Sequence, residues 1–252
     1  MQLELAGKTA LITGSSRGIG YAIAKALHAE GCRIALNGRD ERALATAGLE
    51  LPGAIVACGD VTQPEGARQV VADAIKGLGR LDILVCNVGS GRSVSPGTET
   101  YDEWQRVFAI NLWSATNTVE AAKEALAASG GTIVFISSIC GLEVIPGAPA
   151  TYSAAKAALH AYARCIARPM ANEGIRVNMV SPGNVVFPGS TWEAKLEKDA
   201  AGVQAMLDRD VPLRRLGTPE EVAAAIVFLV SKRAAFITGA NLTVDAGQTR
   251  GW

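Results

Sequence analysis

Short apolar segments alternate along the chain with longer stretches in which alanine and other apolar residues recur at helical spacing. Seven of these segments are strand-like: residues 8–14, 32–38, 54–60, 81–87, 131–137, 175–181 and 241–247. Most are apolar throughout, which is typical of parallel strands that helices cover on both faces. We therefore predict one α/β domain over residues 1–252, with a Rossmann-like, doubly wound, seven-stranded parallel sheet flanked by helices.

One segment does not follow this alternation of strands and helices. Residues 187–219 carry Pro188, Gly189, Pro212 and Gly217 around one or two expected helices. Long insertions at strand ends of compact domains are commonly functional. This one would cover the carboxyl edge of the sheet, where such folds bind ligands, so we predict a substrate lid over about 187–219.

The composition favours a small-molecule ligand over a charged polymer. Among 252 residues, 49% are hydrophobic, and 24 basic side chains balance 24 acidic ones. Because no long run of like charges occurs, we expect neither nucleic acid nor an anionic membrane as a partner. The N-terminus lacks the features of a secretory signal, and the longest apolar run, Val222 to Val230, is too short to span a bilayer. A cytoplasmic protein is expected.

The cysteines and histidines argue against a metal site. Five cysteines stand alone without a Cys-x-x-Cys pair, and the two histidines, His28 and His160, form no His-Glu-x-x-His motif. We therefore expect reduced cysteines and no metal cofactor.

A glycine-rich turn follows the first predicted strand. TGSSRGIG places Gly14, Gly18 and Gly20 directly before a helix expected to begin near Tyr21. Such a loop lets the backbone approach a pyrophosphate, and its amides and the helix N-terminus supply positive potential. The spacing differs from the usual G-x-G-x-x-G, so a plain structural turn is the alternative.

Residues 14–18 also read G-x-S-x-G, the nucleophile elbow of an α/β-hydrolase with Ser16 as the nucleophile. That alternative fails on layout, because the elbow would lie on the first strand, with no earlier strands and no oxyanion loop. In addition, no histidine follows His160 to complete a catalytic triad.

The end of the second predicted strand bears on cofactor choice. An acidic residue about 20 positions after the glycines would bind the ribose 2′-hydroxyl of NAD, but Asn37 occupies that region. Arg39 follows, and Arg17 lies in the glycine loop, so two guanidinium groups could meet a 2′-phosphate. We favour NADP(H) and keep NAD(H) open, because Asp40 could reverse the preference and both arginines could be merely solvated.

Tyr152 and Lys156 are four residues apart, which places them side by side on one helix face. The ordinary pKa of a phenol is about 10, and an ammonium within ~4 to 6 Å can lower it by ~1 to 3. Tyr152 could then give a proton to a carbonyl oxygen as hydride arrives, or remove one from an alcohol. An ordinary surface pair is the alternative. The glycine loop before the pair, a Ser-rich strand end at 137–138 and a Pro-Gly at 182–183 favour the catalytic interpretation.

Together these motifs resemble the short-chain dehydrogenase/reductase family, in its branch of about 250 residues. The resemblance runs nearly end to end: TGSSRGIG at 13–20, Asp60 and Val61, NVG at 87–89, Asn111, Ser138, the Tyr152/Lys156 pair, SPG at 181–183 and ITGANLTVDAG at 237–247.

The resemblance implies a role for each matched residue. Ser138 would bind the substrate oxygen and Tyr152 would act as acid or base. Lys156 would lower the pKa of that tyrosine and hold the nicotinamide ribose. Asn111 would anchor a proton-relay water, with a helix-packing amide as the alternative. The implied cofactor-binding residues are Gly14, Ser16, Arg17, Gly18, Ile19, Gly20, Asn37, Arg39, Asp60, Val61, Asn87, Gly89, Tyr152, Lys156, Pro182, Gly183 and Val185.

The chain departs from the family pattern near the expected substrate pocket. The interval from Ser138 to Tyr152 is longer than usual, so residues 142–151 should bulge beside the pocket. NVG replaces the commoner NAG, and Phe187 replaces a common threonine, which puts a hydrogen bond to the nicotinamide amide in doubt. The residues expected to line or cap the pocket are Leu142, Val144, Ile145, Phe187 and Trp192.

Two further residues of the Tyr152 helix invite interpretation. His160 continues the Tyr152–Lys156 stripe and could be a relay, but we favour a place in packing or a subunit interface. Pro169 predicts a kink or an early end of the helix.

The resemblance thus predicts an NAD(P)(H)-dependent oxidoreductase that interconverts a ketone and a secondary alcohol, most like the 3-oxoacyl-thioester reductases. An NAD-linked sugar or polyol dehydrogenase is the alternative within this class. A catalytically inactive nucleotide-binding scaffold is the alternative outside it, and the intact set of four catalytic residues argues against it. The resemblance also implies a homotetramer built on the helices of Asn111 and Tyr152.

Overall fold

A computed structural model describes residues 2–251 and contains the seven predicted strands. They are β1 (Thr9–Ile12), β2 (Arg33–Gly38), β3 (Ile55–Cys58), β4 (Ile83–Cys86), β5 (Thr132–Ile136), β6 (Arg176–Pro182) and β7 (Asn241–Val244). All pair in parallel, in the order β3-β2-β1-β4-β5-β6-β7. The predicted single α/β domain with a Rossmann-like, doubly wound sheet is confirmed.

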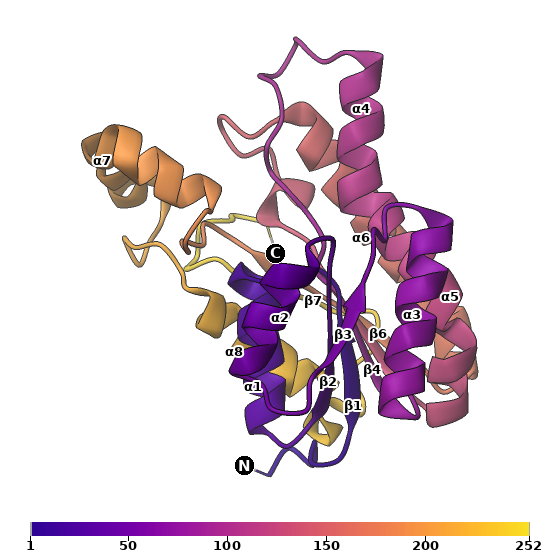
Figure 1. Cartoon of the computed structure of the whole chain (residues 1–252). Coiled ribbons are helices and arrows are strands. Elements are labelled where there is room, and N and C mark those ends of the chain that lie inside the picture. Colours follow the sequence, from indigo (N-terminus) through magenta and orange to yellow (C-terminus); the bar gives the residue numbers. More distant parts are fainter. Residues whose placement is uncertain (1, 252) are drawn as a thin grey trace.

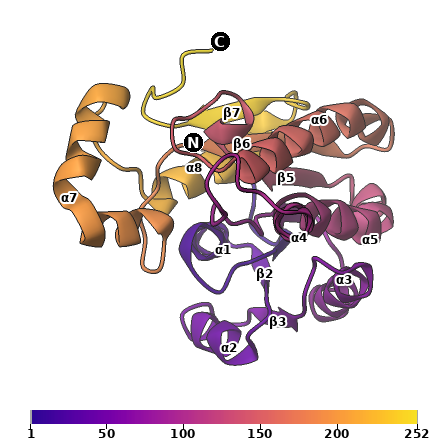
Figure 2. The ribbon, with the colours of Figure 1, turned by 90° about the horizontal axis from the view of Figure 1, so that it is seen from above.

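Helices cover both faces of this sheet. They are α1 (Gly18–Ala29), α2 (Glu41–Leu49), α3 (Pro64–Leu78), α4 (Tyr101–Phe108), α5 (Ser114–Ser129), α6 (Ala150–Asn172), α7 (Thr191–Asp210) and α8 (Pro219–Val230). Short turns add η1 (Ala109–Trp113), η2 (Ile139–Gly141) and η3 (Lys232–Ala234). Seen from above, α1, α2 and α8 lie on one side of the sheet, whereas α3, α5 and α6 lie on the other (Figure 2).

The central strands are apolar because both of their faces are covered. β1, β4 and β5 are buried along their whole length. One core cluster joins the sheet to α1 and α8 through residues such as Ile23 and Ile226, and a second joins it to α3, α5 and α6 through residues such as Val70 and Phe135. Two-sided burial removes the polar alternation that a half-exposed strand would show.

The strand order places the ends of β1 and β4 side by side, although they are far apart in the sequence. The Thr13 amide donates to the Val85 carbonyl at 3.0 Å, and Thr13 Oγ1 accepts from the Asn87 amide at 2.9 Å. The order of the strands reverses at this point, and doubly wound folds bind ligands in the crevice that such a reversal opens. The glycine loop, which follows β1, lies at this crevice.

The segment expected to form a lid carries α7, which stands apart from the sheet in both views (Figures 1 and 2). Its backbone leaves the helical conformation at Asp199 (φ −158°, ψ 78°), so α7 consists of two helical pieces. The base of the segment is closed by backbone hydrogen bonds between Gly217 and residues 184 and 186. A lid function for this segment stays a prediction.

Helix α6 continues through Pro169 to Asn172, so the expected early end at the proline is wrong. A proline removes a hydrogen bond to the carbonyl one turn earlier, here that of Cys165. Pro169 stands in the last turn of the helix, and Cys165 is exposed, so the disruption stays at the solvent-facing end of α6.

All five cysteines are free. Within residues 2–251, no helix is long and apolar enough to cross a membrane, and no three His, Cys, Asp or Glu side chains gather as a metal site would require.

A buried carboxylate ties β4 to β1 at the end of the sheet opposite the crevice. Asp82 is 4% exposed and accepts hydrogen bonds from Lys8 Nζ at 3.1 Å, Arg80 Nη2 at 2.6 Å and the Thr9 amide at 3.1 Å. Burial raises the pKa of Asp82, but the hydrogen bonds from Thr9 and Lys8 outweigh it and leave the pKa below its ordinary value. Ionised Asp82 therefore stabilises the fold.

We predict that Asp82→Asn lowers the free energy of unfolding by about 2 kcal/mol at pH 7, because Lys8 and Arg80 lose their buried partner. The native pKa of Asp82 lies below its unfolded value of about 3.9. Ionised Asp82 therefore stabilises the native state above that pH, and this stabilisation is lost as the pH falls through the native pKa. Urea unfolding should therefore show the difference from wild type shrinking below about pH 4. The exposed Glu65→Gln is the control, and a difference that does not depend on pH would contradict this role of Asp82.

Candidate active site

Ser138, Tyr152 and Lys156 meet where β5 ends and α6 begins. Ser138 follows Ile136, the last residue of β5, while Tyr152 lies in the first turn of α6 and Lys156 one turn later. Lys156 Nζ lies 5.9 Å from the centroid of the Tyr152 ring and donates to the Ile136 carbonyl at 2.8 Å. The structure thus brings three of the four predicted catalytic side chains to one end of α6.

Burial governs the ionisation of both members of the Tyr152–Lys156 pair. Burial raises the pKa of Tyr152 to about 12, and interaction with the Ser138 hydroxyl offsets only part of this rise. Lys156 is 2% exposed, and burial lowers its pKa to about 8. The expectation that Lys156 would bring the tyrosine below its ordinary pKa is therefore wrong for this structure, because the cost of desolvating a phenolate dominates. Tyr152 keeps its proton at neutral pH.

Ser138, rather than Ser137, faces the tyrosine. The Ser138 hydroxyl lowers the pKa of Tyr152 and also accepts a hydrogen bond from the Cys140 amide at 3.2 Å, so it caps η2. The Ser137 hydroxyl is buried and has no hydrogen-bond partner among the described residues. Ser138, to which the family resemblance assigns the catalytic role, is therefore the serine beside the tyrosine.

Asn111 lies beside Lys156, across Gly89. A Cβ placed on Gly89 would lie 3.1 Å from both Asn111 Oδ1 and Lys156 Nζ. Asn111 Nδ2 donates to the Ser90 and Val107 carbonyls, and its Oδ1 accepts from the Ser90 amide at 2.9 Å. The side chain therefore pins the loop after β4, as the packing alternative expects. Its backbone lies in the π-helical turn η1, a local distortion that is frequent at functional sites.

The glycine loop has the geometry of an anion site. Gly14 and Gly18 adopt left-handed φ values of +62° and +59°, and a Cβ on Gly20 would collide with the Gly14 carbonyl and Asn87 Nδ2. The N-terminus of α1 receives no side-chain cap from Arg17 and has no acidic residue in its first turn. Its amides and positive dipole end are thus open to a phosphate, so the loop fits the pyrophosphate of a dinucleotide.

Two asparagines, the buried Asn37 and the half-buried Asn87, brace this loop. Asn87 Nδ2 donates to the Thr13 and Gly14 carbonyls at 3.0 and 2.9 Å. Asn37 Nδ2 donates to two carbonyls at the end of β3, and Asn37 Oδ1 lies 3.4 Å from the Gly14 amide that donates to it. Asn37 was expected to face the cofactor ribose, but its amide is turned into the fold and supports the loop from behind.

The charged residues near the end of β2 differ in what their side chains contact. Arg39 has a side chain that is 76% exposed and lies 4.0 Å from Asp60 Oδ2. Asp40 is instead occupied as the N-cap of α2, where it accepts two backbone hydrogen bonds. Arg17 does not extend toward Arg39 but lies against Gly189 of the 187–219 segment. Of the two arginines predicted to meet a 2′-phosphate, Arg39 is therefore the one that remains available at the end of β2.

The other predicted cofactor residues of the first half of the chain lie at the carboxyl edge of the sheet. The Ser16 hydroxyl faces Gly38, Ile19 packs against the core beneath α1, and Val61 is buried. The Val61 carbonyl accepts from Asn117 Nδ2 of α5 at 3.3 Å. These residues shape the edge mainly through packing and backbone contacts.

The residues after β6 also lie at the carboxyl edge of the sheet. Pro182 ends β6, and a Cβ on Gly183 would lie 2.8 Å from Cβ of Asp245, so the chain passes closely over the end of β7. Val185 is buried and forms an isolated parallel bridge with Gly217. The role of Pro182, Gly183 and Val185 in cofactor binding stays a prediction.

Three contacts around the site, two of them with residues 187–219, were not predicted from the sequence. The Phe187 ring lies over the glycine loop, as shown by the distance of only 2.5 Å between a Cβ placed on Gly18 and the ring. Arg92 Nη2 donates to the Gly189 carbonyl at 3.3 Å. Gly91 lies against the Tyr152 ring, where an added Cβ would be 3.8 Å from Cε1. The only sequence signal for Gly91 and Arg92 is that they directly follow the matched NVG segment.

Residues 142–149 form an irregular loop, in line with the expected bulge. Val144 is 96% exposed, so its side chain does not line a pocket as expected. Glu143 Oε1 instead accepts hydrogen bonds from the Arg250 and Gly251 amides, which joins this loop to the end of the chain. Trp192 packs beneath Lys195 Nζ, 4.3 Å from its ring centroid.

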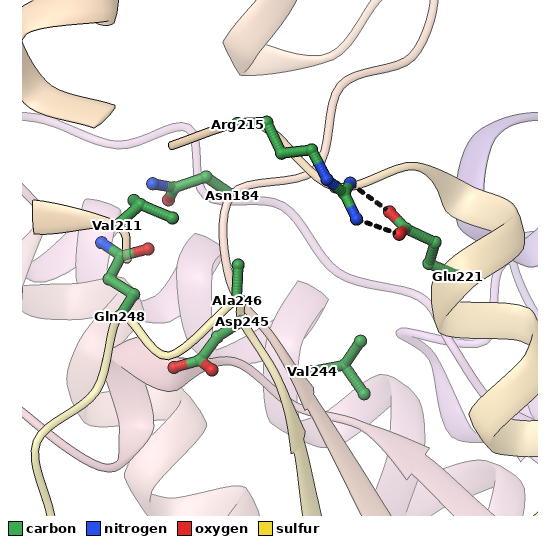
Figure 3. A pocket seen from close by; sticks show the side chains of 9 residues that line it. Asn184, Val211, Arg215, Glu221, Val244, Asp245, Ala246 and Gln248 are labelled. Carbon is green, nitrogen blue, oxygen red and sulfur yellow. Dashed lines mark hydrogen bonds and ion pairs between the residues drawn. The ribbon is translucent and has the colours of Figure 1, made fainter. Parts of the chain in front are cut away.

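A separate small cavity of about 70 Å³ lies near the base of the 187–219 segment (Figure 3). Arg215 and Glu221 form an ion pair in its wall, and Asn184, Asp245 and Gln248 also line it. It contains none of the four predicted catalytic residues, and we do not assign it to the substrate.

The fold and these side chains together define a class of dinucleotide-dependent α/β oxidoreductases. The sequence profile of a family described as enoyl-(acyl carrier protein) reductase matches residues 14–249. The chain belongs to the short-chain dehydrogenase/reductase family.

Relatives of similar identity differ widely in what they act on. The chain is 37% identical to 2-(S)-hydroxypropyl-CoM dehydrogenase 3 of Xanthobacter autotrophicus, with 99% of each chain covered. It is 36% identical to a 3-oxoacyl-[acyl-carrier-protein] reductase of Rickettsia bellii, over 97% of this chain and 98% of that one. The crystal structure of L-sorbose reductase from Gluconobacter frateurii, complexed with NADPH and L-sorbose, matches with a TM-score of 0.93 and 32% identity over the full length of both chains.

We predict that Lys156→Met changes how stability depends on pH. The unfolded pKa of lysine is about 10.4 and the native pKa is lower, so the buried ammonium destabilises the native state at and below the native pKa. Wild type should gain stability relative to the variant, by a few kcal/mol, as the pH rises from about 8 to 10. Denaturant unfolding at several pH values measures this difference, with the exposed Lys198→Met as control. A constant difference across that range would contradict the shifted ionisation of Lys156.

Proposed function

We propose that this chain is an NADP(H)-dependent carbonyl reductase that interconverts a ketone and a secondary alcohol, with Tyr152 as general acid and base. The observation that carries the proposal is the meeting of the Ser138 hydroxyl, the Tyr152 phenol and the buried Lys156 ammonium beside an uncapped glycine loop. The 3-oxoacyl thioesters are the substrate class we favour, supported by the similarity to the Rickettsia bellii reductase.

The nicotinamide supplies the hydride when it is bound. Ser138 would donate a hydrogen bond to the carbonyl oxygen of the ketone and hold it opposite Tyr152. Tyr152 keeps its proton at neutral pH because burial raises its pKa, so it is ready to give that proton to the oxygen as negative charge develops. Lys156 would stabilise the tyrosinate that remains, since its pKa of about 8 leaves it mostly charged at pH 7.

The cofactor preference rests on the end of β2. The exposed Arg39 guanidinium is available to a 2′-phosphate, whereas Asp40 caps α2 through its Oδ1. The structure of L-sorbose reductase contains NADPH, which supports the same preference. The uncapped α1 N-terminus would bind the pyrophosphate.

A ketose or polyol is a second candidate substrate. The full-length structural match to L-sorbose reductase in complex with L-sorbose favours it. For the assembly we keep the prediction of a homotetramer, supported by partly exposed aromatic side chains, Trp104 and Trp113, on α4 and η1.

We expect Tyr152→Phe to lower kcat for ketone reduction by about 10²- to 10⁴-fold, because it removes the donated proton and little else. Loss of NADPH absorbance with a panel of 3-oxoacyl thioesters, ketoses and simple ketones measures the rate. Tyr162→Phe is the matched control, since Tyr162 is on the same helix and packs edge-on against Phe135 in the core. Tight cofactor binding by wild type without turnover of any ketone would instead support the inactive scaffold.

We expect Arg39→Ala to raise the KM for NADPH by about 10- to 100-fold and to leave kinetics with NADH unchanged, because one charged hydrogen-bonding group is lost. Initial rates with both cofactors test this, with Arg68→Ala on the exposed face of α3 as control. A wild-type preference for NADH would overturn the choice of NADP(H) without affecting the proposed proton chemistry.

A further inference from the structure

His160 lies on the same face of α6 as Tyr152 and Lys156, and the proposed chemistry makes no use of it. Its side chain is 7% exposed, so it belongs to the interior of this chain, as the packing interpretation expected. An apolar residue could fill such a site without a polar group to satisfy. The polar contacts of the imidazole therefore need an explanation.

The His160 ring is linked to the two strands at the edge of the sheet. Its Nε2 lies 3.3 Å from Ser181 Oγ of β6, and Ser181 Oγ donates to Asn241 Oδ1 of β7 at 2.6 Å. Asn241 Nδ2 donates to Thr243 Oγ1 at 3.4 Å, which is consistent with that amide orientation. A serine has one proton to give. Because Ser181 gives it to Asn241, Ser181 must accept from His160, and the imidazole proton lies on Nε2.

The same ring supports the turn that carries Ser138. A Cβ placed on Gly141 would lie 2.9 Å from His160 Cδ2 and 2.7 Å from the Lys156 carbonyl carbon, so η2 rests directly on α6 at this point. Within the turn, the Gly141 amide donates to the Ser138 carbonyl at 3.0 Å and the Cys140 amide donates to Ser138 Oγ. The position of Ser138 relative to α6 therefore depends on the Lys156 backbone and the His160 ring, which η2 contacts.

The imidazole makes no second side-chain hydrogen bond within the described residues. Its Nδ1 is buried and has no hydrogen-bond partner there. Burial lowers the pKa of His160, and the backbone carbonyl of Ser138 acts in the opposite direction. Burial favours the neutral ring, with its proton on Nε2 toward Ser181, and the effect of the Ser138 carbonyl places the ring beside the turn.

We propose that His160 is a positioning residue: held by Ser181, its ring supports the Ser138–Gly141 turn and keeps the Ser138 hydroxyl opposite Tyr152. The inference rests on the proposed function, because the position of Ser138 affects rates only if its hydroxyl binds the substrate oxygen. The support of the turn itself is independent of any reaction.

His160→Phe keeps an aromatic ring but removes the Nε2 donor, whereas His160→Gln keeps an amide donor near that position. We expect kcat for ketone reduction to fall about 10-fold in His160→Phe, with an unchanged Kd for NADPH, and to recover to within about threefold of wild type in His160→Gln. Because Ser138 lowers the pKa of Tyr152, the rising limb of the pH profile for alcohol oxidation, where Tyr152 loses its proton, should also move to higher pH in His160→Phe. His28→Gln, at the half-exposed histidine of α1, is the control.

Ser181→Ala tests the pairing. It removes the acceptor for Nε2, so we expect it to resemble His160→Phe, and the double variant should lose about as much as either single variant. Additive losses would overturn the proposed coupling, as would a kcat for His160→Phe within about twofold of wild type.

Cys140 provides a readout that does not depend on activity. It lies half-buried in η2, while Cys165 is exposed on α6 and serves as an internal reference. Peptide mapping after alkylation should show the Cys140/Cys165 rate ratio at least about threefold higher in His160→Phe than in wild type, because the turn opens more readily. An unchanged ratio overturns the proposal. If wild type reduces no ketone and the ratio still rises, the proposed function fails and the support of the turn by His160 stands.

Discussion

The hydrogen bond from Lys156 Nζ to the Ile136 carbonyl is the contact on which the rest of the site depends. Ile136 is the last residue of β5, and Ser138 follows two positions later, so the bond fixes α6 against the strand that carries the serine. Tyr152, one turn before Lys156, is thereby held at the height of Ser138. Burying the Lys156 ammonium costs free energy, and the lowered pKa of Lys156 reflects this cost. The hydrogen bond to the Ile136 carbonyl offsets part of it.

The other half of the site is built by backbone rather than by charged side chains. The end of β1 turns through Gly14 and Gly18 into a helix whose N-terminus has no side-chain cap. Asn87 and Asn37 hold that turn from behind with amide hydrogen bonds to its backbone. The strand reversal between β1 and β4 opens the crevice at which this turn lies, and we propose that the cofactor binds there.

The sequence predicted well those features that follow from local pattern. All seven strands were located from apolar runs, because two-sided burial leaves a continuous apolar signature. The proximity of Tyr152 and Lys156 followed from helical spacing alone. Features that depend on tertiary surroundings were not predictable. The direction of the Tyr152 pKa depends on desolvation by neighbours distant in sequence, and the inward turn of Asn37 depends on free carbonyls at the end of β3.

Hydride transfer from the nicotinamide, with Tyr152 as the proton donor, is the central claim of the proposed chemistry. Transfer of deuterium from NADPH labelled at the nicotinamide C4 is the most direct measurement, with mass spectrometry of the product formed from a ketone that wild type consumes. If this site performs hydride transfer with Tyr152 as the proton donor, the new carbinol carbon carries the label, and Tyr152→Phe forms almost none of this product. Cofactor consumption without label in the alcohol, or full product formation by Tyr152→Phe, would contradict it.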